Sequence, residues 1–258
     1  ADILKKVADL MRARSKELAQ LTIAEAGKPL LEANGEWVVA AQFFEWYAEE
    51  AKRSYGRIIP ASRNNKRMSV ISQPVGVVGI VTAWNFPVWN LCRVWAAALA
   101  AGCTIVAKPS EYTPLTAMAL MELLVEAGLP AGVANLVLGD AAAIGETLLA
   151  RQEVRKIHFV GSTRVGKILL EGAAKTNTKL SLELGGNAPC LIFSDVNVEA
   201  VAKSAAVAKT RNCGQVCVSP QRFLVHEEIY SSFVERVSHY MAQLKVGNGL
   251  EDGTQIGP

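Results

Sequence analysis

Residues 75–108, VGVVGIVTAWNFPVWNLCRVWAAALAAGCTIVAK, carry the pattern that decides the fold. Val77–Val81 and Thr104–Ala107 are short runs rich in β-branched residues, which is typical of buried strands. Val88–Ala100 lies between them, and it has the length and the Ala, Leu and Trp content of a helix. Two strands joined through a helix form a crossover unit, because parallel neighbours cannot be joined by a tight turn. This stretch therefore predicts a parallel sheet.

The alternation of strand and helix continues downstream of this unit. In chain order the sequence predicts a helix, a strand, a helix, a strand, a helix and a strand at Leu115–Ala127, Asn135–Leu138, Ala141–Ala150, Lys156–Val160, Val165–Ala174 and Leu180–Leu184. Parallel strands that are joined by helices are usually buried on both faces. We therefore expect an α/β fold with a doubly wound parallel sheet, covered by helices on both sides.

Other patterns flank the predicted sheet. Residues 1–55 space their apolar side chains as helices do, and Gly27-Lys28-Pro29 divides them into two helices. Ile58–Pro60 and Met68–Gln73, separated by a polar turn, predict a protruding β-hairpin. A second α/β unit begins beyond residue 188, with two strands and two helices at Pro189–Phe193, Phe223–Val225, Val198–Lys209 and Ile229–Leu244.

Length and composition describe an ordinary globular chain. Of its 258 residues 50% are hydrophobic and 20% are charged, which excludes a disordered chain. The net charge of +3 is spread along the sequence, so we expect neither a nucleic acid nor an anionic membrane as a partner. The apolar run Val94–Ala107 is too short to span a bilayer. No secretory signal pattern is visible, and we expect a cytoplasmic protein.

The five cysteines fall into two groups. Cys92, Cys103 and Cys190 lie among apolar residues, where cysteine acts as a small hydrophobic side chain. No Cys-x-x-Cys pair is present, so the sequence predicts neither a zinc site nor a disulfide framework. Cys213 and Cys217 lie instead in a turn rich in Gly, Asn and Gln. Cys217 is there either an activated thiolate nucleophile or a cysteine buried in a turn.

Two strand ends carry residues that suit a nucleotide. Gly161–Gly166 follows a strand and opens a helix, whose free N–H groups and dipole favour a phosphate. Thr163 stands where the usual dinucleotide fingerprint has its middle glycine, so a plain tight turn is the alternative. Lys108 and Glu111 follow another strand. They either hold the two hydroxyls of a ribose or form a solvated ion pair in a loop.

Two further residues are candidates for catalysis. Asn85 follows the strand Val77–Val81. Its neutral amide suits a developing oxyanion in a desolvated pocket, and a simple turn asparagine is the alternative. Glu183 lies inside an apolar strand, where burying a carboxylate is costly. Such a carboxylate either forms a buried structural ion pair or works as a general base.

In this order, these stretches resemble the aldehyde dehydrogenase superfamily, and within it the succinate semialdehyde and 2-oxoglutarate semialdehyde dehydrogenases. The resemblance covers essentially the whole chain. Its motifs are Gln73–Gly79, Trp84–Pro87, Ala98–Gly102, Lys108–Glu111, Phe159–Thr163, Leu182–Asn187 and Gly214–Cys217. So many separate motifs in the family order favour the functional alternative for each stretch.

The resemblance implies NAD(P)-dependent oxidation of an aldehyde to its acid, through a cysteine thiohemiacetal and a thioester. Cys217 is similar to the family's nucleophile, and Asn85, with the backbone N–H of Cys217, to its oxyanion hole. Glu183 is similar to the general base that activates the hydrolytic water. The cofactor contacts that the resemblance implies are Thr82, Trp84, Lys108, Ser110, Glu111, Gly161, Ser162, Leu184 and Gly185. NAD is the expected cofactor, with NADP as the alternative, and no metal is expected.

The resemblance also divides the chain into three parts. Residues 1–56 and 75–187 correspond to an NAD-binding domain, residues 57–74 to an oligomerisation hairpin, and residues 188–258 to the N-terminal part of a catalytic domain. Family members continue with a second cofactor motif and most of the substrate funnel, which this sequence lacks. We therefore expect a piece of a longer protein that forms a homodimer or homotetramer at full length, and we expect no turnover from the piece alone.

Arg93 and Arg211 narrow the expected substrate. Arg93 lies six residues after Pro87 and Arg211 six before Cys217, and both positions hold arginine in family members acting on aldehydes with a far-end carboxylate. A guanidinium group binds a carboxylate through two hydrogen bonds. The pair therefore predicts an ω-carboxyl aldehyde such as succinate semialdehyde. 2-Oxoglutarate semialdehyde, a general aldehyde, and structural ion pairs for the arginines are the alternatives.

Three other functions agree less well with these residues. An acylating enzyme that passes its thioester to coenzyme A needs no hydrolytic base, so Glu183 argues against it. A cationic aldehyde is disfavoured because two arginines near the pocket would repel it. A noncatalytic binding or structural relative comes from a different class, and the presence of Cys217, Glu183 and Asn85 argues against it.

Overall fold

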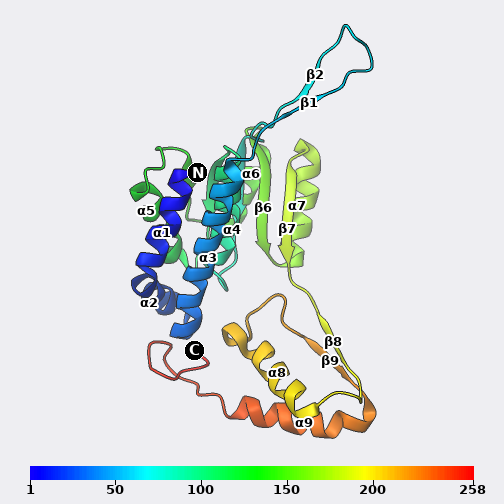
Figure 1. The fold of residues 1–258 in the computed structure, drawn as a ribbon. Coiled ribbons are helices and arrows are strands. Elements are labelled where there is room, and N and C mark those ends of the chain that lie inside the picture. The colour runs from blue at the N-terminus through cyan, green and yellow to red at the C-terminus, as the bar shows by residue number, and fades with distance from the viewer.

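Five parallel strands form the central sheet of the chain. A computed structural model describes residues 1–258 (Figure 1). The strands are β3 (Val77–Val81), β4 (Thr104–Lys108), β5 (Ala134–Leu136), β6 (Val154–Gly161) and β7 (Lys179–Leu184). Their spatial order is β5-β4-β3-β6-β7, and each neighbouring pair is parallel. The order runs outward in both directions from β3, so the predicted doubly wound topology is confirmed.

Helices cover both faces of this sheet. α4 (Trp89–Ala100) and α5 (Pro114–Glu126) pack on one face, and α6 (Ala141–Ala150) and α7 (Thr163–Thr176) on the other. The side chains of β4 alternate accordingly, since Ile105 and Ala107 join the large core while Val106 joins the small core beside α6. The alternation follows from the two-residue period of a strand. The expected and observed bounds of these five strands differ by two residues at most at either end.

Three helices form an outer layer over α4 and α5. They are α1 (Asp2–Ala13), α2 (Ser15–Ala26) and α3 (Leu30–Ala51). Trp37 and Phe44 of α3 are fully buried in the large core. The expectation of one helix before Gly27 is wrong, because the backbone leaves the helical conformation at Arg14. This bend lets both α1 and α2 pack against α3. None of the helices is long and apolar enough to cross a membrane.

A β-hairpin projects from the top of the molecule (Figure 1). Its strands, β1 (Arg57–Ile59) and β2 (Met68–Val70), pair antiparallel, and β2 ends three residues earlier than expected. All six strand residues are exposed, including Ile58. Exposed apolar side chains on an isolated hairpin are typical of a contact surface.

A smaller body follows the sheet at its carboxyl edge (Figure 1). β8 (Pro189–Ile192) and β9 (Arg222–Val225) pair parallel, and α8 (Val198–Thr210) and α9 (Glu227–Ala242) pack against each other. Its core is small and contains Ile192, Ala202, Ala205 and Phe233. The segment from Gly185 to Ala188 joins this body to β7.

The last residues of the chain return to the turn between α2 and α3. The backbone N–H of Leu30 donates to the carbonyl of Gly249 at 3.0 Å. A Cβ atom on Gly249 would lie 2.4 Å from the carbonyl oxygen of Lys28, and one on Gly257 would lie 1.6 Å from that of Gly27. Only glycine permits contacts this close. Backbone contacts therefore fasten the C-terminal segment to the helical layer.

Candidate active site

One cleft of about 930 Å³ lies between the carboxyl edge of the sheet and the smaller body. Its walls include the ends of β3, β6 and β7, parts of α3 and α4, and the loop after α8. Ligands bind to doubly wound sheets at this edge. Ten of the fourteen residues predicted for the site line it, and they are Trp84, Asn85, Arg93, Gly161, Ser162, Glu183, Leu184, Gly185, Arg211 and Cys217.

The loop that carries Cys217 begins with an unusual backbone. After α8, a short 3₁₀ turn, η1 (Arg211–Gly214), contains three consecutive residues with positive φ: Asn212 at 51°, Cys213 at 56° and Gly214 at 78°. Asparagine and glycine tolerate this left-handed region best, and cysteine is rare there. The turn lets the chain reverse direction, and Cys217 follows it at the cleft.

Exposure separates Cys217 from the other cysteines. Cys92 and Cys103 are buried, Cys190 and Cys213 are half-buried, and Cys217 is exposed. Burial raises the pKa of the Cys92 thiol well above its usual value, and the Glu36 carboxylate adds to the rise. A thiol must ionise to act as a nucleophile. Cys217 is therefore the cysteine that solvent and a substrate reach.

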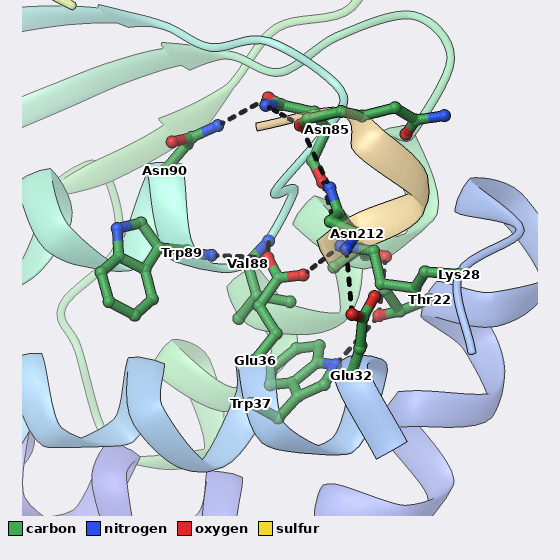
Figure 2. Close-up of polar contacts among 12 residues, drawn as sticks. Thr22, Lys28, Glu32, Glu36, Trp37, Asn85, Val88, Trp89, Asn90 and Asn212 are labelled. Atoms are coloured by element: carbon green, nitrogen blue, oxygen red, sulfur yellow. Dashed lines mark hydrogen bonds and ion pairs between the residues drawn. The ribbon is translucent and has the colours of Figure 1, made fainter. Parts of the chain in front are cut away.

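Asn85 is held from several sides (Figure 2). Its side-chain Nδ2 donates to the carbonyl of Gln215 at 2.9 Å. Its own backbone carbonyl accepts from Lys28 Nζ at 2.9 Å and from Asn212 Nδ2 at 2.8 Å. Asn90 Nδ2 lies 3.5 Å from Asn85 Oδ1, which fits the orientation of the amide. An amide nitrogen has two hydrogens, so one N–H remains for a ligand in the cleft.

Glu183 lies closer to solvent than expected. Its side chain is 50% exposed, because β7 is the edge strand of the sheet. The expectation of a buried carboxylate is therefore wrong for this chain. Oε1 of Glu183 lies 3.6 Å from Nη2 of Arg93. Arg93 therefore has Glu183 as an acidic neighbour in this structure, at the long end of ion-pair distances.

A histidine next to this pair carries no charge at neutral pH. Burial, together with the charges of Arg93 and Lys156, lowers the pKa of His158 to about 4. His158 Nε2 is buried without a hydrogen-bond partner. His158 therefore does not compete with Arg93 for the Glu183 carboxylate.

Arg211 also lines the cleft. It opens η1, and its guanidinium group lies 5.9 Å from the centre of the Phe86 ring. The aromatic face attracts the cation and limits where it lies. Arg93 on α4 and Arg211 on η1 therefore line the same cleft from different elements.

Lys108 and Glu111 lie at a separate, smaller hollow of about 140 Å³. Lys108 is buried, Glu111 is exposed, and Lys108 Nζ donates to Glu111 Oε2 at 2.6 Å. This hydrogen bond lowers the pKa of Glu111. The Ser110 hydroxyl accepts from the N–H of Tyr112. Ser110 and Thr82 are both buried and line neither hollow.

The start of α7 forms the remaining part of the predicted cofactor region. Ser162 caps this helix, and its hydroxyl accepts from the N–H of Val165 at 3.3 Å. The first turn of a helix carries free N–H groups that suit an anion. Gly185 also lines the cleft, and a Cβ atom there would meet nothing within 4 Å. The region thus leaves room beside a helix N-terminus. No three acidic, cysteine or histidine side chains lie together as metal ligands would.

Sequence reasoning missed three buried polar residues beside Asn85. They are Lys28, Glu36 and Asn212, which are at most 5% exposed. A signal for Glu36 was present, because it shares the apolar face of α3 with Ala33, Trp37 and Ala40, at helical spacing. A charged residue on such a face requires a partner.

Comparison with known proteins assigns the family. The sequence profile described as aldehyde dehydrogenase family matches residues 1–258. The chain belongs to the aldehyde dehydrogenase family. This confirms the resemblance found in the sequence.

Individual relatives are similar over the whole chain. The mitochondrial succinate-semialdehyde dehydrogenase of Oryza sativa subsp. japonica is 51% identical over 99% of this chain and 48% of its own length. The glutarate-semialdehyde dehydrogenase of Pseudomonas putida is 48% identical over 99% of this chain and 53% of its own. The crystal structure of an NADP-dependent enzyme from E. coli matches with a TM-score of 0.95 and 47% identity, over 100% of this chain and 53% of its own. The chain thus spans about half the length of these relatives.

We expect Glu111 to determine the preference between the two cofactors. Its carboxylate should repel the 2′-phosphate of NADP, so NAD should bind at least about tenfold more tightly. Glu111→Gln keeps a hydrogen-bond acceptor for Lys108 and should narrow this difference. Fluorescence titration of NAD and NADP measures both affinities. Glu17→Gln, an exposed change on α2, is the control, and equal affinities in the unaltered protein would contradict the role of Glu111.

Proposed function

We propose that the full-length protein containing this chain oxidises an ω-carboxyl aldehyde, such as succinate semialdehyde, to its carboxylic acid with NAD or NADP. The observation that carries the proposal is the shared cleft, where a thiol, an amide, a carboxylate and two guanidinium groups meet. The names of the relatives, for succinate and glutarate semialdehyde, support an aldehyde with a far carboxylate. 2-Oxoglutarate semialdehyde has the same feature and is the alternative substrate.

The residues fit a dinucleotide along the carboxyl edge of the sheet. Lys108 and Glu111 would hold the ribose hydroxyls of the adenosine half, and the start of α7 at Ser162 would hold the pyrophosphate. The open space at Gly185 supports this fit. When bound, the cofactor supplies the hydride acceptor. Thr82, Trp84, Ser110, Gly161 and Leu184 complete the proposed set of cofactor contacts.

Cys217 starts the proposed reaction. Its thiolate attacks the aldehyde carbon, a C–S bond forms, and the carbonyl π electrons move onto oxygen. The free N–H of Asn85 and the backbone N–H of Cys217 would hold this oxyanion. Both donors are neutral, and a desolvated site strengthens their bonds to the developing charge. Loss of hydride from the carbon then leaves a thioester on Cys217.

Glu183 completes the reaction in this proposal. Its carboxylate takes a proton from water, the hydroxide attacks the thioester carbonyl, and the C–S bond breaks to release the acid and the thiolate. The ion pair between Glu183 and Arg93 is weak, because the two groups are 3.6 Å apart and the Glu183 side chain is half-exposed. Arg93 is therefore free to exchange this partner for the carboxylate of a substrate.

We also propose the division of the chain into domains. Residues 1–56 and 75–187 form the NAD-binding domain, and residues 188–258 the first part of the catalytic domain. Residues 57–74 would serve oligomerisation, since Ile58, Met68 and Val70 expose apolar side chains on the hairpin. A homodimer or homotetramer of the full-length protein is the proposed assembly.

The decisive experiment compares two aldehydes of similar length in arginine variants. Arg93→Ala and Arg211→Ala should each raise KM for succinate semialdehyde about 30-fold, since losing a charged hydrogen-bonding partner weakens binding by roughly 2 kcal/mol. Butanal has no carboxylate, and its KM should change little. Steady-state absorbance of the reduced cofactor measures both. If KM rises equally for both aldehydes, the arginines are structural and the ω-carboxyl proposal fails.

A further inference from the structure

A buried ion pair lies directly behind the candidate active site. Lys28 Nζ is 2.6 Å from Glu36 Oε2, and the two side chains are only 3% and 2% exposed. Removing two charges from water costs several kcal/mol for each, and apolar replacements of such pairs are often no less stable. Stability alone therefore does not account for this pair.

Both partners also bind the segment that carries Asn85 (Figure 2). Lys28 Nζ donates to the carbonyl of Asn85 at 2.9 Å. Glu36 Oε1 accepts from the N–H groups of Val88 at 2.8 Å and Trp89 at 2.9 Å. The ion pair thus holds the segment before and after Pro87, which itself has no N–H to donate.

Asn212 connects the same carbonyl to the loop of Cys217. Its Nδ2 donates to the carbonyl of Asn85 at 2.8 Å and lies 3.3 Å from the carbonyl of Gln215. Its backbone N–H donates to Glu32 Oε1 at 2.9 Å, which holds the residue in its left-handed conformation against α3. The Asn85 carbonyl therefore accepts one bond from Lys28 and one from Asn212, so both of its lone pairs are occupied.

We propose that Lys28, Glu36 and Asn212 are positioning residues that hold the Asn85 amide in register with the thiol of Cys217. We call these three residues the Asn85 clamp. Glu36 and Asn212 also line the cleft, and in this proposal all three residues act through the Asn85 backbone rather than on the aldehyde or the cofactor. The inference rests on the proposed function, in which the Asn85 amide receives the oxyanion. A donor fixed in advance stabilises that charge without reorganisation, and a displacement of about 1 Å costs on the order of a hundredfold in rate.

Two variants loosen the clamp while keeping the fold. The double variant Lys28→Met/Glu36→Gln removes both charges together, so neither stays buried alone, and it retains an oxygen for Val88 and Trp89. Asn212→Gly removes the side chain, and glycine adopts the same positive φ without strain. We expect each variant to lower kcat for succinate semialdehyde about 10- to 100-fold and to leave KM and cofactor affinity within about twofold.

A pair of thiol reactions isolates the oxyanion step without cofactor. Acylation of Cys217 by p-nitrophenyl acetate forms an oxyanion, whereas alkylation by iodoacetamide forms none. In the full-length gene product, both clamp variants should slow acylation by the same factor as kcat and leave alkylation unchanged. Thr22→Val is the matched control, because it removes a buried hydrogen bond to Trp37 without touching the clamp. It should lower thermal stability and leave both reactions unchanged.

Combination with Asn85→Ala tests whether the clamp acts through Asn85. Asn85→Ala should slow acylation. Adding Lys28→Met/Glu36→Gln to it should slow acylation little further, since both changes remove the same interaction, that of the Asn85 amide with the oxyanion. Losses that multiply overturn the clamp. If Asn85→Ala slows acylation and the clamp variants do not, the clamp is overturned and the proposed function stands. Unchanged acylation in Asn85→Ala overturns the oxyanion role itself, and the clamp with it.

Discussion

Cys217→Ala should lower aldehyde oxidation by at least about a thousandfold while cofactor affinity stays within about twofold, because alanine offers no nucleophile and the proposed ribose contacts lie at another hollow. The fold should tolerate the change. Cys217 is exposed, and its sulfur takes part in no hydrogen bond. Steady-state oxidation of succinate semialdehyde, with cofactor titration and a thermal melt on the same preparation, measures the three quantities.

A second cysteine provides the control for this result. Cys213 lies four residues before Cys217 in the same loop, and its sulfur accepts from the N–H of Gly257 at 3.3 Å. Cys213→Ala should lower the melting temperature slightly and retain oxidation. Fast turnover in Cys217→Ala, or equal losses in the two variants, would rule out Cys217 as the nucleophile.

Glu183→Gln should separate formation of the thioester from its hydrolysis. The neutral amide cannot take a proton from water, so the thioester should accumulate. Stopped-flow absorbance should record a rapid burst of about one reduced cofactor per site, followed by turnover roughly a hundredfold slower than in the unaltered protein. Losing the charge also frees Arg93, so the KM for succinate semialdehyde should not rise.

An added nucleophile checks this interpretation. Hydroxylamine attacks a thioester without a general base, so it should restore turnover in Glu183→Gln. It should not restore turnover in Cys217→Ala, which forms no thioester. A Glu183→Gln variant without a burst would mean that Glu183 acts before the thioester forms.

The alternating pattern from Val77 to Leu184 predicted the sheet well. Runs of β-branched residues between helical segments leave few other arrangements, and the crossover rule then determines that neighbouring strands are parallel. The same pattern did not predict the position of each strand within the sheet. Glu183 was expected to be buried, because an apolar strand in the sequence does not reveal whether it becomes a central or an edge strand.

The buried contacts of the site were the hardest to predict. Lys28 and Glu36 are eight residues apart on either side of a helix start, and the Asn85 carbonyl that Lys28 binds lies 57 residues further along the chain. Contacts across such distances depend on packing in three dimensions rather than on local periodicity. Asn85, Gly161 and Gly185 were easier to place, because each follows the end of a predicted strand, and parallel strands end at one edge of the sheet.

The glycine contacts of the C-terminal segment mean that the site is completed late in synthesis. The sheet is complete when the ribosome has added Leu184, yet the turn at Gly27 obtains its neighbour only with Gly257, 73 positions later. At about 5–20 residues per second, this interval lasts about 4 to 15 s. Gly257 contacts the loop of Cys217 through Cys213, so this loop obtains that contact only after the residues of the whole sheet have been added. The nascent chain thus holds every strand of the sheet before it holds the last residue that contacts the loop of the thiol.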